Sequence, residues 1–216
     1  RFRESTKGDN DGGGLGWTQG SGNPNEVVRG LQGLLLKDVA GSTKSLQQQV
    51  NYVTCHDNLA LADKLRTCGI IEADLGKASV LANGLVLTSE GIRFMHGGEE
   101  ILRSKPIYEN GIWTGEYSHN SYNLPDSSNS LKWENKVIYA AAYDAYKDLV
   151  HISTSQSAFH IFSDSVSTSN YKVQQSGSKI VVEITTPTNM KDADDWSKIT
   201  IIYSNANGNN TSHTLS

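Results

Sequence analysis

A short apolar segment that ends in a polar triplet constrains this chain more than any other feature. Residues 50–55 alternate in the manner of a short, largely buried strand and are rich in β-branched and aromatic side chains. His56, Asp57 and Asn58 follow directly. In an α/β barrel the chemistry lies at the carboxyl ends of the strands, so these three residues are the first candidates for a functional site.

Three other interpretations of the triplet were weighed. Asp57 or Asn58 could instead cap the helix that the apolar residues after position 58 predict. A nucleophilic pair of Cys55 and His56 is disfavoured, because adjacent residues on a strand face opposite sides. A metal site is disfavoured, because no second pair of ligands lies at a usable spacing.

The elements around the triplet predict an α/β fold followed by an all-β segment. Apolar residues at helical spacing predict a helix from Asn25 that ends before Gly41, and further helices over 59–66, 75–88 and 137–149. A second strand over 92–95 gives the strand, helix, strand order of a parallel sheet. Beyond about residue 155 the pattern becomes alternating, as strands require, over 158–162, 171–175, 179–184 and 199–203.

Composition excludes several classes of function. The chain has 216 residues, 37% of them apolar, with 19 Lys plus Arg against 23 Asp plus Glu. A chain of that length can bury a sizeable core. The slight excess of acidic residues disfavours binding to the phosphate backbone of nucleic acid. No apolar run reaches the ~18 residues of a spanning helix, so we expect no transmembrane segment. The glycine-rich stretch 8–25 lacks both nucleotide-binding spacings and is interpreted as a surface loop. Cys55 and Cys68 are expected to be reduced.

Residues 104–133 form a long polar segment, interpreted as a loop at the same face as the triplet. It is rich in Asn, Ser, Tyr and Trp. Amides and carboxylates match sugar hydroxyls, and aromatic rings stack on the apolar face of a pyranose. Long loops in compact domains are usually functional, so this composition favours carbohydrate binding over an ordinary surface loop.

Three segments, taken together, carry a family resemblance. Residues 52–58 read YVTCHDN, residues 94–105 read FMHGGEEILRSK, and residues 120–133 read NSYNLPDSSNSLKW. In this order they resemble the type I pullulanases, the α-1,6-debranching members of glycoside hydrolase family 13, which is the α-amylase family. The resemblance implies the C-terminal part of a (β/α)8 TIM barrel over 1–154, with strands 7 and 8, and part of a C-terminal β-sandwich over 155–216.

The resemblance also implies roles for individual residues. Asp57 resembles the family's third carboxylate, which stabilises the transition state, and His56 and Asn58 resemble neighbouring substrate-binding residues. Asn120, Asn123 and Asp126 are expected beside the substrate cleft. The nucleophile pattern GFRxD does not occur in the sequence, and neither does the motif of the acid/base Glu. We therefore expect a chain that is inactive alone.

Two functions of different class follow. The first is part of a retaining α-1,6-glucan debranching hydrolase acting on pullulan, branched dextrin, amylopectin or glycogen. The second is a non-catalytic carbohydrate-binding module derived from an α-amylase-family barrel. Upstream coding sequence would discriminate between them, because only the first requires the nucleophile and the acid/base.

No cofactor is expected. Some members of that family bind calcium, but Asp9, Asn10 and Asp11 are too few oxygen ligands for an ion that prefers about six to eight. A barrel with two strands would leave sheet edges unpaired, so self-association is expected. Localisation stays unassigned, with an extracellular or cell-envelope location as the expectation if a signal region lies upstream.

Overall fold

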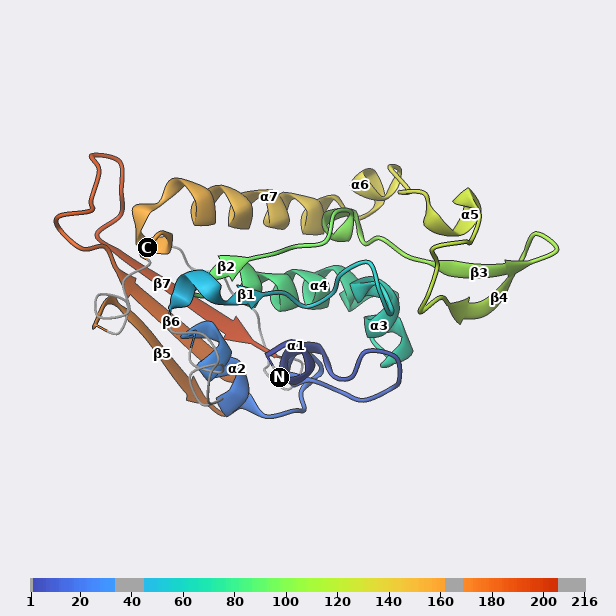
Figure 1. Cartoon of the computed structure of the whole chain (residues 1–216), viewed down its shortest axis with the longest axis horizontal. Helices are drawn as coiled ribbons and strands as arrows, with labels where there is room; N and C mark the ends of the chain where they lie inside the picture. The colour runs from blue at the N-terminus through green and yellow to red at the C-terminus, as the bar shows by residue number, and fades with distance from the viewer. Residues whose placement is uncertain (1, 34–44, 162–168, 206–216) are drawn as a thin grey trace.

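The computed structural model describes residues 2–33, 45–161 and 169–205 (Figure 1). The helices are α1 Phe2–Lys7, α2 Pro24–Leu31, α3 Leu61–Thr67, α4 Glu72–Leu87, α5 Asp126–Asn129, α6 Asn135–Ile138 and α7 Ala140–Ser155. The strands are β1 Val50–Asn51, β2 Ile92–Arg93, β3 Pro106–Glu109, β4 Ile112–Tyr117, β5 Tyr171–Ser176, β6 Lys179–Thr185 and β7 Lys198–Ser204. Short 3₁₀-helices lie at Trp17–Gln19, Leu46–Gln48, Glu99–Ile101 and Ser157–Phe159.

Helix α4 lies at the centre of the molecule. It is apolar on most of its circumference, and Leu75, Ala82 and Leu85 are completely buried. A helix that is apolar all round must be covered by its neighbours. Helix α7 runs along one side of α4, and α3 contacts it near its first turns (Figure 1). The predicted helices 59–66 and 75–88 are confirmed, and the helix predicted over 137–149 is present as α6 and α7 with a break at Tyr139.

The strand, helix, strand order is confirmed by the pairing of β1 with β2. The two strands are parallel, with Val50 opposite Ile92 and Asn51 opposite Arg93. Each strand has two residues, fewer than predicted. Val50 and Ile92 are about half exposed, and no third strand joins this sheet within the described residues, so its ladder is short.

Asn51 ties this pair to its surroundings. Its buried amide donates to the carbonyl oxygens of Gly30 at 3.2 Å and Glu90 at 2.9 Å, and to Ser89 Oγ at 2.9 Å. Gly30 belongs to α2, so one side chain joins strand β1 to helix α2 and to the segment that leads into β2. The predicted helix from Asn25 is confirmed as far as α2 extends, and its part beyond residue 33 lies outside the described residues.

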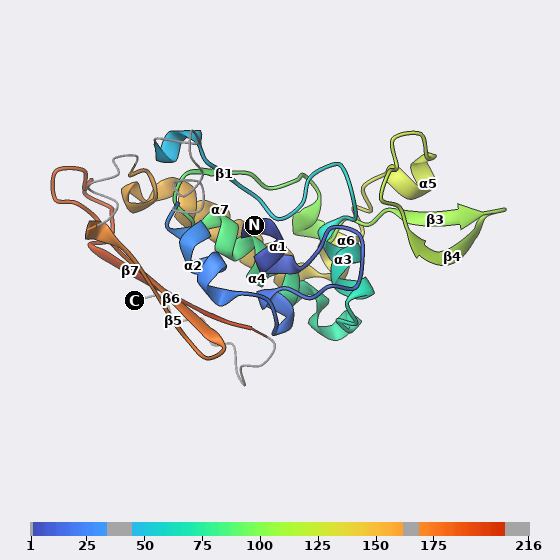
Figure 2. The ribbon, with the colours of Figure 1, turned by 60° about the horizontal axis from the view of Figure 1, so that its bottom comes forward.

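Strands β5, β6 and β7 form an antiparallel sheet at one end of the molecule, against the helices (Figure 2). Alternate residues of β6 are completely buried, namely Ile180, Val182 and Ile184. They belong to the same apolar cluster as the inner face of α4. The strands predicted over 171–175, 179–184 and 199–203 are confirmed.

Two sequence expectations are corrected by the structure. Residues 158 and 159 of the predicted strand 158–162 belong to the 3₁₀-helix Ser157–Phe159, where the carboxylate of Asp195 accepts from Ser157 N at 2.9 Å. The segment 104–133 contains the β3–β4 hairpin and α5 rather than only loop. Asn110 and Gly111 form the turn with φ of 51° and 80°, the positive values that a tight hairpin turn requires.

In the described part of the chain, every helix is too short or too polar to cross a lipid bilayer.

Candidate functional site

The predicted triplet follows β1 and presents its side chains to solvent. The side chains of His56 and Asp57 are 83% and 66% exposed, and His56 Nε2 lies 3.5 Å from Asp57 Oδ1. Both groups are therefore available to a ligand. Asn58, which is half-buried, has the positive φ of 62° that Asn tolerates better than most residues.

A buried lysine holds the backbone of the triplet. The ammonium of Lys105 donates to the carbonyl oxygen of His56 at 3.1 Å and also to that of Asn58. These two carbonyls lie on either side of Asp57, so the main chain beneath that carboxylate is fixed at both ends. Burial lowers the pKa of Lys105, while the nearby Asp63 carboxylate acts in the opposite direction.

Asp63 in α3 fixes Lys105 in turn. Its carboxylate accepts from Lys105 N at 2.7 Å and from the hydroxyl of Ser104. Asp63 is completely buried, and burial raises its pKa to about 6 against these hydrogen bonds. The segment after β2 is thereby joined to the helix that follows the triplet.

A second buried carboxylate lies on the inner side of the same region. Glu99 accepts from the hydroxyl of Thr54 and from Asn83 Nδ2, the latter at 2.6 Å. Asn83 also donates to Tyr146 Oη at 2.9 Å, which connects α4 with α7. Burial raises the pKa of Glu99 to about 8. The segment before the triplet is therefore anchored to both long helices.

The glycine-rich loop reaches the site through Asp11. With the amide nitrogen of Asn58 turned toward it, Asn58 donates to Asp11 Oδ1 at 2.9 Å. His119 Nδ1 lies 2.9 Å from the same oxygen. Lys64, which is buried, holds this loop by donating to Asp9 Oδ1 at 2.6 Å and to two glycine carbonyls. The loop is thus a wall of the site rather than an unattached surface segment.

Of the three predicted binding residues that follow the triplet in the sequence, only one lies near it. Asn120, Asn123 and Asp126 are exposed. Asp11 contacts both His119 and Asn58. Asn120 directly follows His119 and is therefore near the triplet. Asn123 and Asp126 lie at α5, which packs beside β3 (Figure 1). Within the described part of the chain, no hydrogen bond or ion pair joins them to His56 or Asp57.

Sequence reasoning missed the supporting residues. Lys105 lies inside the segment FMHGGEEILRSK, so the sequence identifies it as part of a motif but does not predict which backbone groups it contacts. Asp11 and His119 are distant in the sequence, and only the fold brings them together. Among the residues that the structure describes, no group of three or more His, Cys, Asp or Glu side chains could hold a metal ion.

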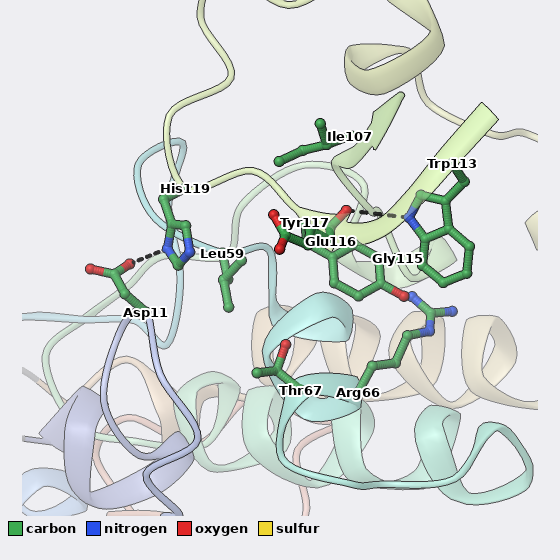
Figure 3. Close-up of a pocket in the computed structure, with 10 residues that line it drawn as sticks. All are labelled: Asp11, Leu59, Arg66, Thr67, Ile107, Trp113, Gly115, Glu116, Tyr117 and His119. Atoms are coloured by element: carbon green, nitrogen blue, oxygen red, sulfur yellow. Dashed lines mark hydrogen bonds and ion pairs between the residues drawn. The ribbon is translucent and has the colours of Figure 1, made fainter. Parts of the chain in front are cut away.

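A cleft of about 600 Å³ opens beside these residues, between α3 and the β3–β4 hairpin (Figure 3). Its walls include Trp113 and Tyr117 from the hairpin and Arg66 from α3, with Asp11 and His119 at the opposite side. None of the six residues predicted from the sequence lines it.

Known proteins similar in sequence to this chain are pullulanases. A pullulanase of Bacillus subtilis is 29% identical over 138 residues, which cover 62% of this chain and 18% of that protein. The chloroplastic pullulanase 1 of Arabidopsis thaliana is 35% identical over 100 residues, covering 40% of this chain and 10% of that protein. This chain therefore spans a small part of these relatives. No family model matches it.

Solved structures agree. A pullulanase of an Anoxybacillus species, crystallised in complex with maltotetraose, superposes with a TM-score of 0.77 at 27% identity over 95% of this chain and 28% of its own. The pullulanase of Bacillus acidopullulyticus gives a TM-score of 0.77 at 29% identity over 93% of this chain and 23% of its own. The resemblance drawn from the three sequence segments is confirmed, and the chain is pullulanase-like in both sequence and fold.

Proposed function

We propose that this chain is part of a retaining glycoside hydrolase that cleaves α-1,6 linkages in branched α-glucans. The proposal is supported by the three sequence segments and by the similarity of the chain to pullulanases. The single observation that carries it is the exposed pair of His56 and Asp57, which follows parallel strand β1 after residues 52–55 and lies on a backbone held by Lys105.

The fold is proposed to divide in the same way. Residues 1–154 would be the C-terminal part of a (β/α)8 barrel, with β1 and β2 as its seventh and eighth strands. Residues 155–216 would be part of a C-terminal β-sandwich. The parallel β1–β2 pair supports the first assignment, and the antiparallel β5–β6–β7 sheet supports the second.

Asp57 is proposed to stabilise the transition state. A retaining glycosidase uses one carboxylate as nucleophile and another as acid/base, about 5 Å apart, around an oxocarbenium-like transition state. Asp57 does neither. It accepts hydrogen bonds from the hydroxyls of the sugar at the cleavage point and keeps the neighbouring acid protonated through like-charge repulsion. His56 and Asn58 contact the same sugar.

Asn120, Asn123 and Asp126 are proposed to contact parts of the glucan that lie away from Asp57. They are exposed, and amides and carboxylates match sugar hydroxyls. The substrate would be an α-glucan such as pullulan, branched dextrin, amylopectin or glycogen. Because the sequence contains no GFRxD pattern, the chain is proposed to be inactive until joined to a segment that supplies the nucleophile and the acid/base.

The test is hydrolysis of pullulan, measured as new reducing ends. The 216-residue chain is compared with the product of the same gene extended upstream to a complete barrel. Activity only in the extended protein is the expected result. No activity in either would favour a non-catalytic carbohydrate-binding module, and activity in the short chain would contradict the assignment of the carboxylates.

A further inference from the structure

The cleft between α3 and the β3–β4 hairpin has no role in the proposed mechanism. It is bounded by an aromatic pair on the hairpin, since Trp113 and Tyr117 have ring centroids 5.8 Å apart at an angle of 48°. The indole of Trp113 is 49% exposed. Its Nε1 donates to the carbonyl oxygen of Glu116 at 3.2 Å, so the ring is held in place while its surface stays accessible.

The charges around the cleft disfavour anionic ligands. Asp11 and Glu116 both contribute carboxylates to its walls (Figure 3). The one guanidinium in the walls, that of Arg66, is already committed to Glu72 through two hydrogen bonds of 2.9 and 3.1 Å. A phosphate or carboxylate ligand would therefore meet uncompensated negative charge.

The same groups suit a neutral polyhydroxyl ligand. Carboxylates accept from hydroxyl groups, and an imidazole such as that of His119 adds a further polar contact. The exposed face of Trp113 offers a flat apolar surface for a pyranose ring. The volume of about 600 Å³ is within the range of small-molecule sites.

We infer that this cleft is a second carbohydrate-binding site, in which Trp113 stacks on a sugar ring of a short, neutral α-glucan chain. The site is separate from the triplet, although Asp11 lines the cleft and also faces Asn58. The choice of an α-glucan as ligand rests on the proposed function. The preference for a neutral sugar follows from the aromatic ring and the acidic walls, and is independent of that function.

The test uses the 216-residue chain with maltotetraose as the probe. The chain has four tryptophans, whose indole N–H signals are assigned by single Trp→Phe substitutions. On titration, the signal of Trp113 shifts and saturates, while that of Trp133, which is 65% exposed and outside the cleft, stays in place. An unmoved Trp113 signal, or equal shifts of both signals, overturns the inference.

Substitutions give a second measurement. Trp113→Ala lowers the affinity for maltotetraose by about tenfold or more, and Trp113→Phe, which keeps a flat ring, retains most of it. Trp133→Ala is the matched control and leaves the affinity unchanged. Because Trp113 lies on an exposed hairpin, the melting temperatures of these variants stay close to that of the parent chain. Equal affinity in Trp113→Ala and the parent would exclude the site.

Failure of this inference and failure of the proposed function are distinguishable. Trp113 lines the cleft and Asp57 does not, so the Trp113 signal reports on the cleft alone, whereas pullulan hydrolysis reports on the triplet. If the extended protein does not hydrolyse pullulan while Trp113 still responds to maltotetraose, the proposed function fails and the cleft site stands. If hydrolysis occurs and Trp113 is unresponsive, the reverse holds.

Discussion

At the scale of single residues, the exposed side chains of the candidate site lie on a backbone that buried charged residues hold in place. The side chains of His56 and Asp57 face solvent, whereas Lys105 and Asp63 beneath them are buried. Buried charges of this kind are tolerated only when they are paired and hydrogen-bonded. Here the hydrogen bonds of Lys105 and Asp63 also fix the loop that carries the candidate site.

The role of Asp57 gives the first prediction. In the extended protein, Asp57→Asn is expected to lower the rate of pullulan hydrolysis by about 10²–10³-fold, the scale of losing one transition-state contact. The free energy of unfolding should change by less than about 0.5 kcal/mol, because the side chain is mostly exposed. Asp148→Asn, an exposed carboxylate on α7, is the control. An unchanged rate in Asp57→Asn would refute the assignment.

Glu99 gives a prediction about pH. Burial raises its pKa from 4.5 to about 8, so the folded state holds this proton more tightly than the unfolded chain does. The stability that the protonated form contributes is fully present below about pH 4.5. It is lost as the pH rises toward 8. The free energy of unfolding should therefore fall over this interval.

Other groups restrict the interval in which Glu99 can be isolated. As the pH rises from about 3.8 to 6, the raised pKa of Asp63 also makes stability fall. His96, whose pKa burial lowers from 6.5 to about 4, makes stability rise with pH between these two values. Lys7, whose pKa burial lowers from 10.5 to about 8, makes stability rise with pH near pH 8 in the parent chain and in Glu99→Gln alike. Urea titrations between about pH 6.5 and pH 8 should therefore show a more negative slope of stability against pH in the parent chain than in Glu99→Gln. Identical slopes in the two proteins would show that another group is responsible.

The candidate site was only partly predictable from individual residues. His56, Asp57 and Asn58 could be identified because they follow an alternating strand. Lys105 acts on main-chain carbonyls 47 and 49 residues away, and no local pattern encodes such partners. The contact of Asp11 with His119 spans 108 residues, so the sequence indicates Asp11 only as part of a calcium ligand set that is too small.

At the scale of elements, the contact of α4 with β7 depends on a glycine and a tyrosine. A Cβ on Gly84 would lie 3.1 Å from the ring of Tyr203, so the helix approaches the sheet closely at this point. The buried hydroxyl of Tyr203 donates to the Gly84 carbonyl oxygen at 2.9 Å and lies 2.6 Å from Thr88 Oγ1. The ring and the hydroxyl together join the helical layer to the antiparallel sheet.

This contact predicts the effect of removing one oxygen atom. Tyr203→Phe is expected to lower the free energy of unfolding by about 1–2 kcal/mol, because buried partners lose a hydrogen bond while the packing of the ring is kept. Urea unfolding at fixed pH measures the change. Tyr122→Phe, at a tyrosine that is 83% exposed, should have no measurable effect. Equal stability of the two variants would mean that the hydroxyl of Tyr203 contributes nothing.

Periodic elements were predictable and short ones were not. The long helix α4 and the strands β5 to β7 repeat apolar residues often enough for their type to be inferred. The β3–β4 hairpin was missed although Asn110 and Gly111 form a strong turn signal, because the surrounding polar segment was interpreted as a loop. Strand β1 is shorter than its pattern suggested because its length depends on neighbouring strands.

At the scale of the whole molecule, one apolar core joins the helices to the antiparallel sheet, while the parallel pair lies at the surface. Residues of α3, α4, β6 and β7 belong to the same buried cluster. In contrast, Val50, Ile92 and Phe94 are 42% to 50% exposed around the β1–β2 pair. Exposed strand edges with apolar side chains are templates for pairing with another chain.

The chain is accordingly expected to self-associate. In size-exclusion chromatography with light scattering, the mean mass should rise with concentration, and Ile92→Lys should reduce that rise by placing a charge beside the edge. Ile71→Lys is the matched control, because Ile71 is 63% exposed and lies outside both strands. A monodisperse monomer with a cooperative thermal transition would contradict the expectation.

The attachment of Lys105 also bears on how this site can diversify. Its ammonium contacts main-chain oxygens of residues 56 and 58, and every amino acid carries such an oxygen. The side chain of His56 can therefore be exchanged without removing these bonds, whereas Asn58 is also held by its positive φ and by its contact with Asp11. At position 56 the backbone geometry of the site does not depend on which side chain is present, which makes this position a suitable starting point for altering specificity.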